Sequence, residues 1–363
     1  MKKYIFILLM TIVMFAVAAC NSNPNSPSSG QSSNSPSSDS ESVKVPDTVP
    51  EKMKDLYLAA LEEGELTFWT ATDVDEIKEL ESMFNETYPG IKVNHFEIQP
   101  GEAAQRYITE HAANKVGVDV MDGAIRFFAP ITERDLAQQL NFEDYGVTET
   151  YAENRYLTEY HLSYPIGVNT DLVSEDEIPK TWEDILDPKW DGKIIFESRA
   201  GALAVLAQEW GEERAREYLD RLLQLNPIIT RGGTPTSQAL AAGEGAFAIG
   251  TYAYRLENLK NEGAPVDWAR TDVIPAGNYV LAVLDKAPHP NAGALWIIWL
   301  NSAEGTKALE KARGSAKLTG PHISSLGQKM KDADVKVIVE DEKNAEKTSA
   351  LSEEFSKRVS SLR

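Results

Sequence analysis

Short apolar runs alternate with amphipathic segments between Gly64 and residue 121, and this alternation restricts the fold more than any other feature of the sequence. The apolar runs are 66–69, 91–96 and 118–121, and the amphipathic segments between them are 73–88 and 102–114. The runs have the length of strands, and the amphipathic segments place apolar residues three or four positions apart, as helices do. Strands and helices in this order predict a mainly parallel sheet with helices on both faces. Ligands of such sheets bind beyond the carboxyl ends of the strands, so the loops 70–73 and 122–126 are expected at a binding site.

A second series of strands and helices follows residue 160, which indicates a second lobe. The expected ranges are 51–161 with 275–363 for the first lobe, and 162–274 for the second lobe. Extended passages near 162–168 and 270–280 are expected to join the lobes as a hinge. The charged, helix-rich residues 316–363 are expected to pack on the first lobe, and the sequence assigns them no role.

Four phrases occur in order along the chain: YPIGVNTDLV (164–173), IPKTWEDILDPKWDGKI (178–194), LAAGEGAFAIG (240–250) and KAPHPNAGALWIIWLNSAEGTKALE (286–310). Together they resemble the extracellular solute-binding proteins of the ferric-iron and related ABC importers. The resemblance implies an α/β fold, a two-lobed periplasmic-binding-protein (type II) clamshell. In this fold each lobe is a mainly parallel sheet flanked by helices, and two hinge strands join the lobes. It also implies a small ligand in the cleft between the lobes and an ABC permease as the membrane partner.

The N-terminus has the pattern of a lipoprotein signal peptide at 1–19, with two lysines, an apolar run and small residues before Cys20. Cys20 is the only cysteine, and its context resembles a bacterial lipobox, so we expect it to carry lipid rather than a free thiol. The Ser-, Pro- and Asn-rich segment 20–50 cannot bury enough apolar surface to fold, and it is expected to be a flexible tether. These features predict an extracytoplasmic protein, lipid-anchored to the outer face of the cell membrane. An uncleaved anchor helix is the alternative.

Acidic residues outnumber basic residues by 56 to 36, which gives a net charge of −20. Nucleic acid and anionic headgroups are therefore unfavourable partners, and membrane contact is expected only through the lipid on Cys20. The five histidines include no pair at metal-site spacing, and no nucleophile elbow or phosphate-binding glycine loop is present. We expect a monomeric binding protein without a cofactor and not an enzyme, with an extracytoplasmic hydrolase as an alternative.

Polar loops at the ends of expected strands supply the candidate ligand contacts. They are Thr70, Ala71, Thr72, Arg126, Tyr164, Ser198, Arg199, Arg231, Gly232, Gly233, Thr234 and Tyr252. Amides at a helix N-terminus favour a negative group, glycines allow close backbone approach, and an arginine fork matches a carboxylate or phosphate. A small anionic organic solute held by Arg199 and Arg231 is therefore the favoured ligand. Plain helix capping and surface ion pairs are the structural alternatives for these residues.

Ferric iron is the competing ligand, because relatives that bind it use neighbouring tyrosines, and Tyr252 and Tyr254 fall in the matching region. If this segment is helical, the two rings diverge by about 200°. Asp122 and Glu197 would oppose an anion in the same cleft and would suit a metal or an ammonium group. Solute capture for an ABC importer is the main interpretation, and a sensing or interaction lipoprotein not coupled to transport is a further alternative.

Overall fold

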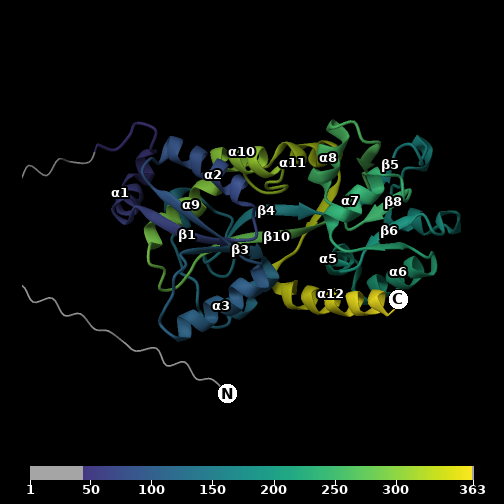
Figure 1. Cartoon of the computed structure of the whole chain (residues 1–363), viewed down its shortest axis with the longest axis horizontal. Coiled ribbons are helices and arrows are strands. Elements are labelled where there is room, and N and C mark those ends of the chain that lie inside the picture. The colour runs from purple at the N-terminus through teal and green to yellow at the C-terminus, as the bar shows by residue number, and fades with distance from the viewer. Residues whose placement is uncertain (1–43, 362–363) are drawn as a thin grey trace, which may run out of the picture. The chain divides into compact units, whose positions relative to one another are not determined.

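Two β-sheets with helices on their faces make up the part of the chain that the computed structural model describes, residues 44–361 (Figure 1). The predicted signal peptide, Cys20 and most of the predicted tether lie outside the described residues. We call the part built on the sheet of β1 (Glu65–Thr70) the first lobe, and the part built on the sheet of β5 (Gly167–Asn169) the second lobe.

The sheet of the first lobe has six strands, in the order β11-β10-β3-β1-β2, with β4 also paired to β10. Besides β1, the strands are β2 (Lys92–Glu97), β3 (Val120–Ala124), β4 (Leu157–Ser163), β10 (Val273–Val283) and β11 (Lys336–Val339). β1 is parallel to β2 and to β3, which confirms the strand and helix alternation expected for this part of the chain. β10 runs antiparallel to β3 and β4, so the sheet as a whole is mixed.

The sheet of the second lobe has five strands, in the order β7-β6-β8-β5-β9. Besides β5, the strands are β6 (Ile194–Glu197), β7 (Ile228–Thr230), β8 (Phe247–Ile249) and β9 (Val266–Trp268). β6 is parallel to β7 and β8, whereas β5 is antiparallel to β8 and β9. The two-lobed α/β fold is confirmed, with mixed sheets in both lobes.

Helices pack on these sheets. They are α1 (Lys54–Glu63), α2 (Val74–Thr87), α3 (Pro100–Ala112), α4 (Ala129–Thr132), α5 (Gly201–Trp210), α6 (Glu212–Gln224), α7 (Gly233–Ala241), α8 (Ala253–Asn261), α9 (Pro290–Leu300), α10 (Ala303–Arg313), α11 (Ser325–Asp332) and α12 (Ala345–Ser360). The helix α9 is apolar all round because it lies between α1 and the first sheet. Among residues 44–361, no helix has both the length and the apolar character that a membrane span requires.

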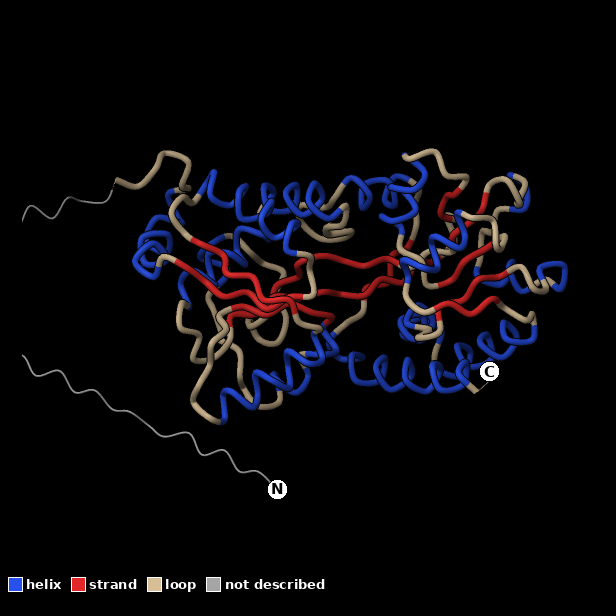
Figure 2. Tube along the Cα trace, in the orientation of Figure 1, coloured by secondary structure: helices blue, strands red, loops and turns tan. Residues whose placement is uncertain are grey.

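Strands β4 and β10 form the connection between the lobes. They pair with each other in antiparallel fashion from Ala276 and Ser163 to Leu281 and Leu157, and Figure 2 shows both running from one sheet toward the other. The chain enters the second lobe between β4 and β5 and leaves it between β9 and β10. These passages lie where the sequence predicts the hinge.

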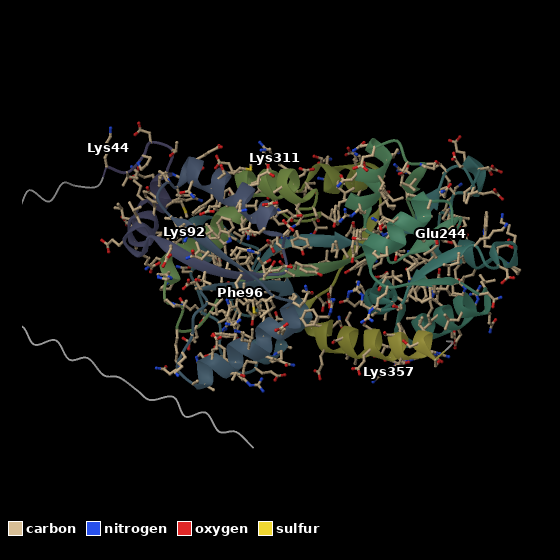
Figure 3. All side chains as sticks on the ribbon, viewed as in Figure 1. Lys44, Lys92, Phe96, Glu244, Lys311 and Lys357 are labelled. Atoms are coloured by element: carbon tan, nitrogen blue, oxygen red, sulfur yellow. The ribbon has the colours of Figure 1, made fainter. Side chains whose placement is uncertain are left out.

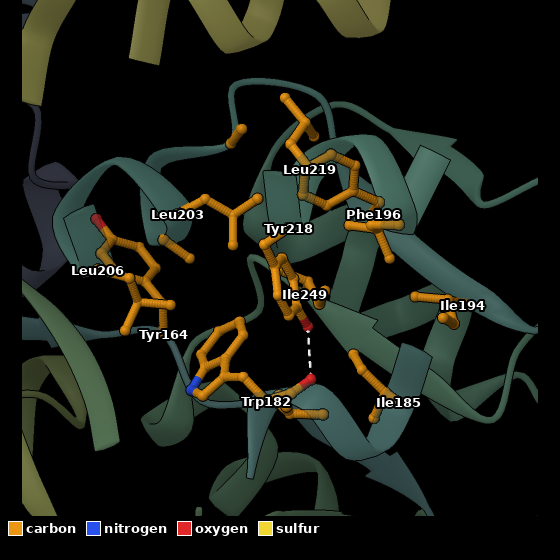
Figure 4. Packing of buried hydrophobic residues seen from close by; sticks show 14 of the residues in the cluster. Tyr164, Trp182, Ile185, Ile194, Phe196, Leu203, Leu206, Tyr218, Leu219 and Ile249 are labelled. Carbon is orange, nitrogen blue, oxygen red and sulfur yellow. Dashed lines mark hydrogen bonds between the residues drawn. The ribbon is translucent and has the colours of Figure 1, made fainter. Parts of the chain in front are cut away.

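The sequence segment that begins at Ile178 contributes to the core of the second lobe. Thr181 caps the short helix 182–186 through a capping box, and Trp182 then points into the core shown in Figure 4. The Trp182 indole Nε1 donates to the Val273 carbonyl at 2.8 Å, and the Tyr218 hydroxyl donates to the Trp182 carbonyl at 2.8 Å. The phrase therefore serves packing, because its polar groups are used inside the lobe.

The C-terminal helices α11 and α12 pack mainly on the second lobe, so the prediction that residues 316–363 pack on the first lobe is wrong for these helices, whereas β11 joins the sheet of the first lobe. Leu351, Phe355 and Val359 of α12 belong to the apolar cluster of α5, α6 and β6, and Leu318 and Met330 join the cluster on the other face of the second sheet. The amphipathic pattern correctly indicates a buried face but carries no information about which sheet buries it. In Figure 1, α12 runs along the lower edge of the second lobe, and its N-terminal end contacts η2 (Ile125–Phe127) of the first lobe.

Buried His161 of β4 makes the stability of the fold depend on pH. Its pKa is lowered to about 3, first by burial and then by the charge of Lys317, and its Nδ1 accepts from the Leu318 amide at 3.0 Å. An unfolded histidine titrates near pH 6.5, so below that pH the unfolded chain binds more protons than the folded chain, and stability falls as the pH falls.

We expect wild type to lose about 2 kcal/mol of unfolding free energy relative to His161→Gln between pH 7 and pH 5. The difference between the two proteins isolates His161 from the other titrating groups. Urea unfolding at each pH measures it, and an equal pH slope in both proteins would contradict the assignment.

Candidate functional site

A cleft lies between the lobes, with β4 and β10 at its base, and it contains two adjoining cavities. Leu162, Tyr252 and Tyr279 line both cavities. The first cavity, of about 370 Å³, is lined by Arg126 and Arg199 and is called the arginine cavity. The second, of about 330 Å³, is lined by Asp122, Glu76 and Arg313 and is called the carboxylate cavity. Each has the size of a small-molecule site.

The N-terminus of α5 opens into the arginine cavity. Ala200 adopts the left-handed conformation and turns the chain from β6 into the helix, so Gly201 and Ala202 line the cavity. Within residues 44–361, no acceptor bonds the amides of Gly201 and Ala202, and the space where a Gly201 side chain would begin is open. Free amides at a helix N-terminus attract a negative group.

The two arginines of this cavity come from different lobes, and each is held by a buried carboxylate of its own side. Arg126 Nη1 donates to Glu340 Oε2 at 2.7 Å, and Arg199 Nε donates to Glu197 Oε1 at 2.8 Å. A guanidinium has five N–H donors, so most donors of both arginines remain for a ligand. The carboxylates orient the arginines and reduce the net positive charge of the cavity.

One further wall of the arginine cavity comes from α12, which contributes Ser349, Ser352, Glu353, Ser356 and Lys357. Lys357 pairs with Glu353 at 2.6 Å. Figure 3 labels Lys357 on this helix. The C-terminal helix is thus both a part of the core of the second lobe and a wall of the cleft.

The carboxylate cavity has three acids around one cation. Arg313 Nη1 lies 3.5 Å from Glu159 Oε1, and its Nε lies 3.4 Å from Glu76 Oε2. Asp122 Oδ2 accepts from the Thr70 hydroxyl at 2.9 Å. Its Oδ1 and both carboxyl oxygens of Glu159 have no donor of their own among the described residues, but the two carboxyl groups are close enough to share a proton. Burial raises the pKa of Asp122 and raises that of Glu159 well above its usual value, while the charge of Arg313 acts against both shifts.

Tyrosine rings separate and flank the two cavities. Tyr160 and Tyr279 stack at a centroid distance of 4.5 Å, and Arg313 lies 4.4 Å from the Tyr160 ring centroid. Tyr252 and Tyr254 also stack, at 5.9 Å with an interplanar angle of 5°. The condition for the expected divergence, a helical segment at both tyrosines, is not met, because Tyr252 is extended and precedes α8 while Tyr254 lies in its first turn.

Several of the residues predicted from the sequence meet in the cleft. Arg126, Tyr164, Arg199 and Tyr252 line the arginine cavity, and Ala71 and Thr72 line the carboxylate cavity. Thr70 is buried behind them, where it positions Asp122. Trp69 and Phe128 are buried in the core of the first lobe and line neither cavity.

The loop around Arg231 does not line the two cavities of the cleft. Ser198 and Arg231 line a separate cavity of about 210 Å³ beside the end of α12, which Arg199 also borders. The Gly232 amide donates to Glu197 at 3.0 Å, and a side chain at Gly233 would collide with the Tyr252 ring. Thr234 lines neither of the two cavities of the cleft. Gly233 therefore serves the packing of Tyr252, and Arg231 does not line the arginine cavity with Arg126.

Sequence reasoning missed Glu159, Tyr160, Tyr279, Arg313 and the wall formed by α12. Tyr160 and Tyr279 alternate along strands, and Arg313 ends a helix, so each resembles an ordinary structural residue until the fold brings them together. Among residues 44–361, no group of three or more histidine, cysteine, aspartate or glutamate side chains is placed to hold a metal ion.

Two lobes that enclose a ligand-sized, polar and aromatic cleft define the class of clamshell binding proteins. The family model for the bacterial extracellular solute-binding proteins matches residues 69–307, which is more than half of the chain. The chain belongs to this family, whose members bind solutes and are not enzymes. The predicted family resemblance is confirmed.

Solved structures share the fold over most of the chain. An iron-bound HitA from Pseudomonas aeruginosa has a TM-score of 0.65 at 18% identity, covering 81% of this chain and 99% of its own. The apo ferric ion-binding protein A of Pasteurella haemolytica has a TM-score of 0.67 at 14% identity, covering 82% and 98%. A structure described as a GABA receptor has a TM-score of 0.66 at 19% identity, covering 80% and 96%. At these identities the likeness establishes the fold alone.

A curated relative matches part of the chain. It is an uncharacterized protein of Haemophilus influenzae, 30% identical over 167 residues, which are 42% of this chain. The match spans 46% of the length of that relative.

Proposed function

We propose that the chain is the solute-binding subunit of an ABC importer and that it captures a small organic solute with a negatively charged group. The observation that carries the proposal is the arginine cavity. There Arg126 of one lobe, Arg199 of the other and the free amides at the start of α5 surround one space between the lobes. Such donors stabilise a carboxylate or phosphate group.

Because Arg126 and Arg199 belong to different lobes, binding of one anion by both arginines would favour closure of the lobes. An anion that contacts Arg126 and Arg199 together stabilises the arrangement in which the two lobes are close, and β4 with β10 forms the hinge. The solute therefore shifts the population toward the closed form, which a permease would recognise.

The anchor and the membrane partner are part of the proposal. A lipid on Cys20 and the tether at 20–50 would keep a monomeric binding protein at the outer face of the cell membrane, within reach of an ABC permease. The supporting observations are the lipobox-like context of Cys20 and the family of the folded part. A sensing lipoprotein on the same fold is the competing role.

Ferric iron is the second candidate ligand, and the stacked pair of Tyr252 and Tyr254 favours it. Parallel rings in one wall of the cleft are compatible with two phenolate ligands to one ion. Burial raises the pKa of Tyr252 and raises that of Tyr279 to about 12, so each hydroxyl stays protonated unless a cation displaces the proton. Structures of iron-binding proteins with this fold support the comparison.

Native mass spectrometry of the chain, purified from a bacterium that exports it, distinguishes these ligands. We expect a small organic anion that is released on denaturation and no visible phenolate-to-iron absorption band. A visible band in wild type that disappears in Tyr252→Phe would overturn the anion proposal. The same spectrum tests the anchor, because a processed chain would have the mass of residues 20–363 plus acyl chains.

A further inference from the structure

More acidic than basic side chains surround the carboxylate cavity. Asp122 and Glu76 line it, Glu159 lies against Arg313, and Asp73 stands at its rim. Among the described residues that line the cavity, Arg313 is the single cation, and its contacts are already divided between Glu76, Glu159 and the Thr72 hydroxyl. A positive group brought by a ligand would complete the charge balance.

Asp122 lies in the buried wall of this cavity, in contact with the carboxyl group of Glu159. The side chain is only 4% exposed, and Thr70 fixes the Oδ2 atom, while the buried Oδ1 has no donor among the described residues unless Asp122 and Glu159 share a proton. A buried acceptor without a donor costs free energy, and the cost is higher for a charged group. A donor on a bound solute would remove that cost, and an ammonium group would also favour the ionised form of Asp122 against the effect of burial.

The walls of the carboxylate cavity are aromatic. The stacked pair Tyr160 and Tyr279 and the stacked pair Tyr252 and Tyr254 all line it. Faces of aromatic rings attract cations, and Arg313 already uses the Tyr160 face in this way. Carboxylate oxygens together with tyrosine faces are a set of groups that recognises an organic ammonium ion.

We infer that the carboxylate cavity is an ammonium subsite, so that the captured solute is dipolar, with its anionic group in the arginine cavity and its ammonium group beside Asp122. This inference rests on the proposed function. The two cavities share Leu162, Tyr252 and Tyr279, so one elongated molecule can occupy both without crossing the protein core. The subsite selects amino-substituted anions over anions that lack the amino group.

Isothermal titration calorimetry of the full-length chain with matched probes tests the inference. The probes are short ω-amino carboxylates and the n-alkanoates of the same chain length. We expect the amino member of a pair to bind about tenfold tighter or more, because a charge-assisted hydrogen bond contributes about 1.5–3 kcal/mol. Asp122→Asn should weaken binding of the amino carboxylate about tenfold. It should change the dissociation constant of the alkanoate by less than about twofold.

Asp75→Asn is the matched control, since it removes the same charge at an exposed position of α2 beside Lys78, outside the lining of the cavity. It should change either affinity by less than about threefold. If Asp122→Asn fails to fold, Glu76→Gln replaces it and should weaken the amino member selectively.

The outcomes separate the two proposals. Equal affinity for both members of each pair, with both affinities lost in Arg199→Ala, would overturn the ammonium subsite and leave anion capture intact. If neither the amino carboxylates nor the alkanoates bind, both the ammonium subsite and the proposal of anion capture are overturned. An affinity for the amino member that Asp122→Asn and Glu76→Gln do not change would also overturn the subsite.

Discussion

Truncation of the chain after Asn344, which removes α12, is expected to lower the free energy of unfolding by roughly 5 kcal/mol or more, because each buried apolar side chain contributes about 1.5–3 kcal/mol. Leu351, Phe355 and Val359 of α12 are buried in the core of the second lobe. A domain has a total stability of about 5–15 kcal/mol, so the second lobe of the truncated chain should be largely unfolded. Urea unfolding followed by tryptophan fluorescence measures the change.

A charge-only variant serves as the control for this truncation. Glu354 bonds Arg216 of α6 through both carboxyl oxygens, at 2.9 Å each, and the pair is partly exposed. Glu354→Gln should therefore cost less than about 1 kcal/mol. A truncated chain with an unchanged unfolding midpoint would show that α12 does not belong to the core of the second lobe.

Arg199→Ala is expected to weaken binding of the co-purified anionic solute by about 10- to 100-fold, since a hydrogen bond to a charged group contributes about 1.5–3 kcal/mol. Arg199 is 59% exposed at its side chain and borders the arginine cavity beside the free amides of α5. Its loss removes donors from the side of the second lobe and leaves Arg126 alone. Calorimetric titration with the identified solute gives the ratio of dissociation constants.

Arg231→Ala is the matched control for this prediction. Arg231 lies on the neighbouring loop of the same lobe and lines the separate cavity beside the end of α12. It should change the affinity by less than about twofold. Equal losses in Arg199→Ala and Arg231→Ala would place the anion in that separate cavity instead of the inter-lobe cleft.

The fold of the first lobe could be predicted from local patterns, because each element carries its own periodicity. The alternation between Gly64 and residue 121 correctly indicates β1, α2, β2, α3 and β3, and the rule for strand ends correctly places 70–73 and 122–126 beside a cavity. The position of α12 could not be predicted in this way. Its apolar face is visible in the sequence, but its partner surface depends on a path of the chain that only the tertiary structure defines.

In the candidate site, too, some residues could be predicted from local sequence patterns and others could not. Arg199 follows a strand in a loop, so its place in the cleft could be inferred, whereas Arg313 ends an ordinary amphipathic helix and enters the cleft only through the packing of α10 on α2. Gly233 illustrates the opposite error. The sequence predicts that the lack of a side chain at Gly233 leaves room for a ligand, but the Tyr252 ring occupies that space.

The central claim is that a small solute binds between the lobes, in contact with both. A crystal structure of the chain purified with its natural solute tests this most directly. The account predicts an anionic group within hydrogen-bonding distance of Arg126, Arg199 and the Gly201 amide, with the rest of the solute against Tyr252 and Tyr279. A solute bound outside this cleft, or one that contacts a single lobe, would contradict it.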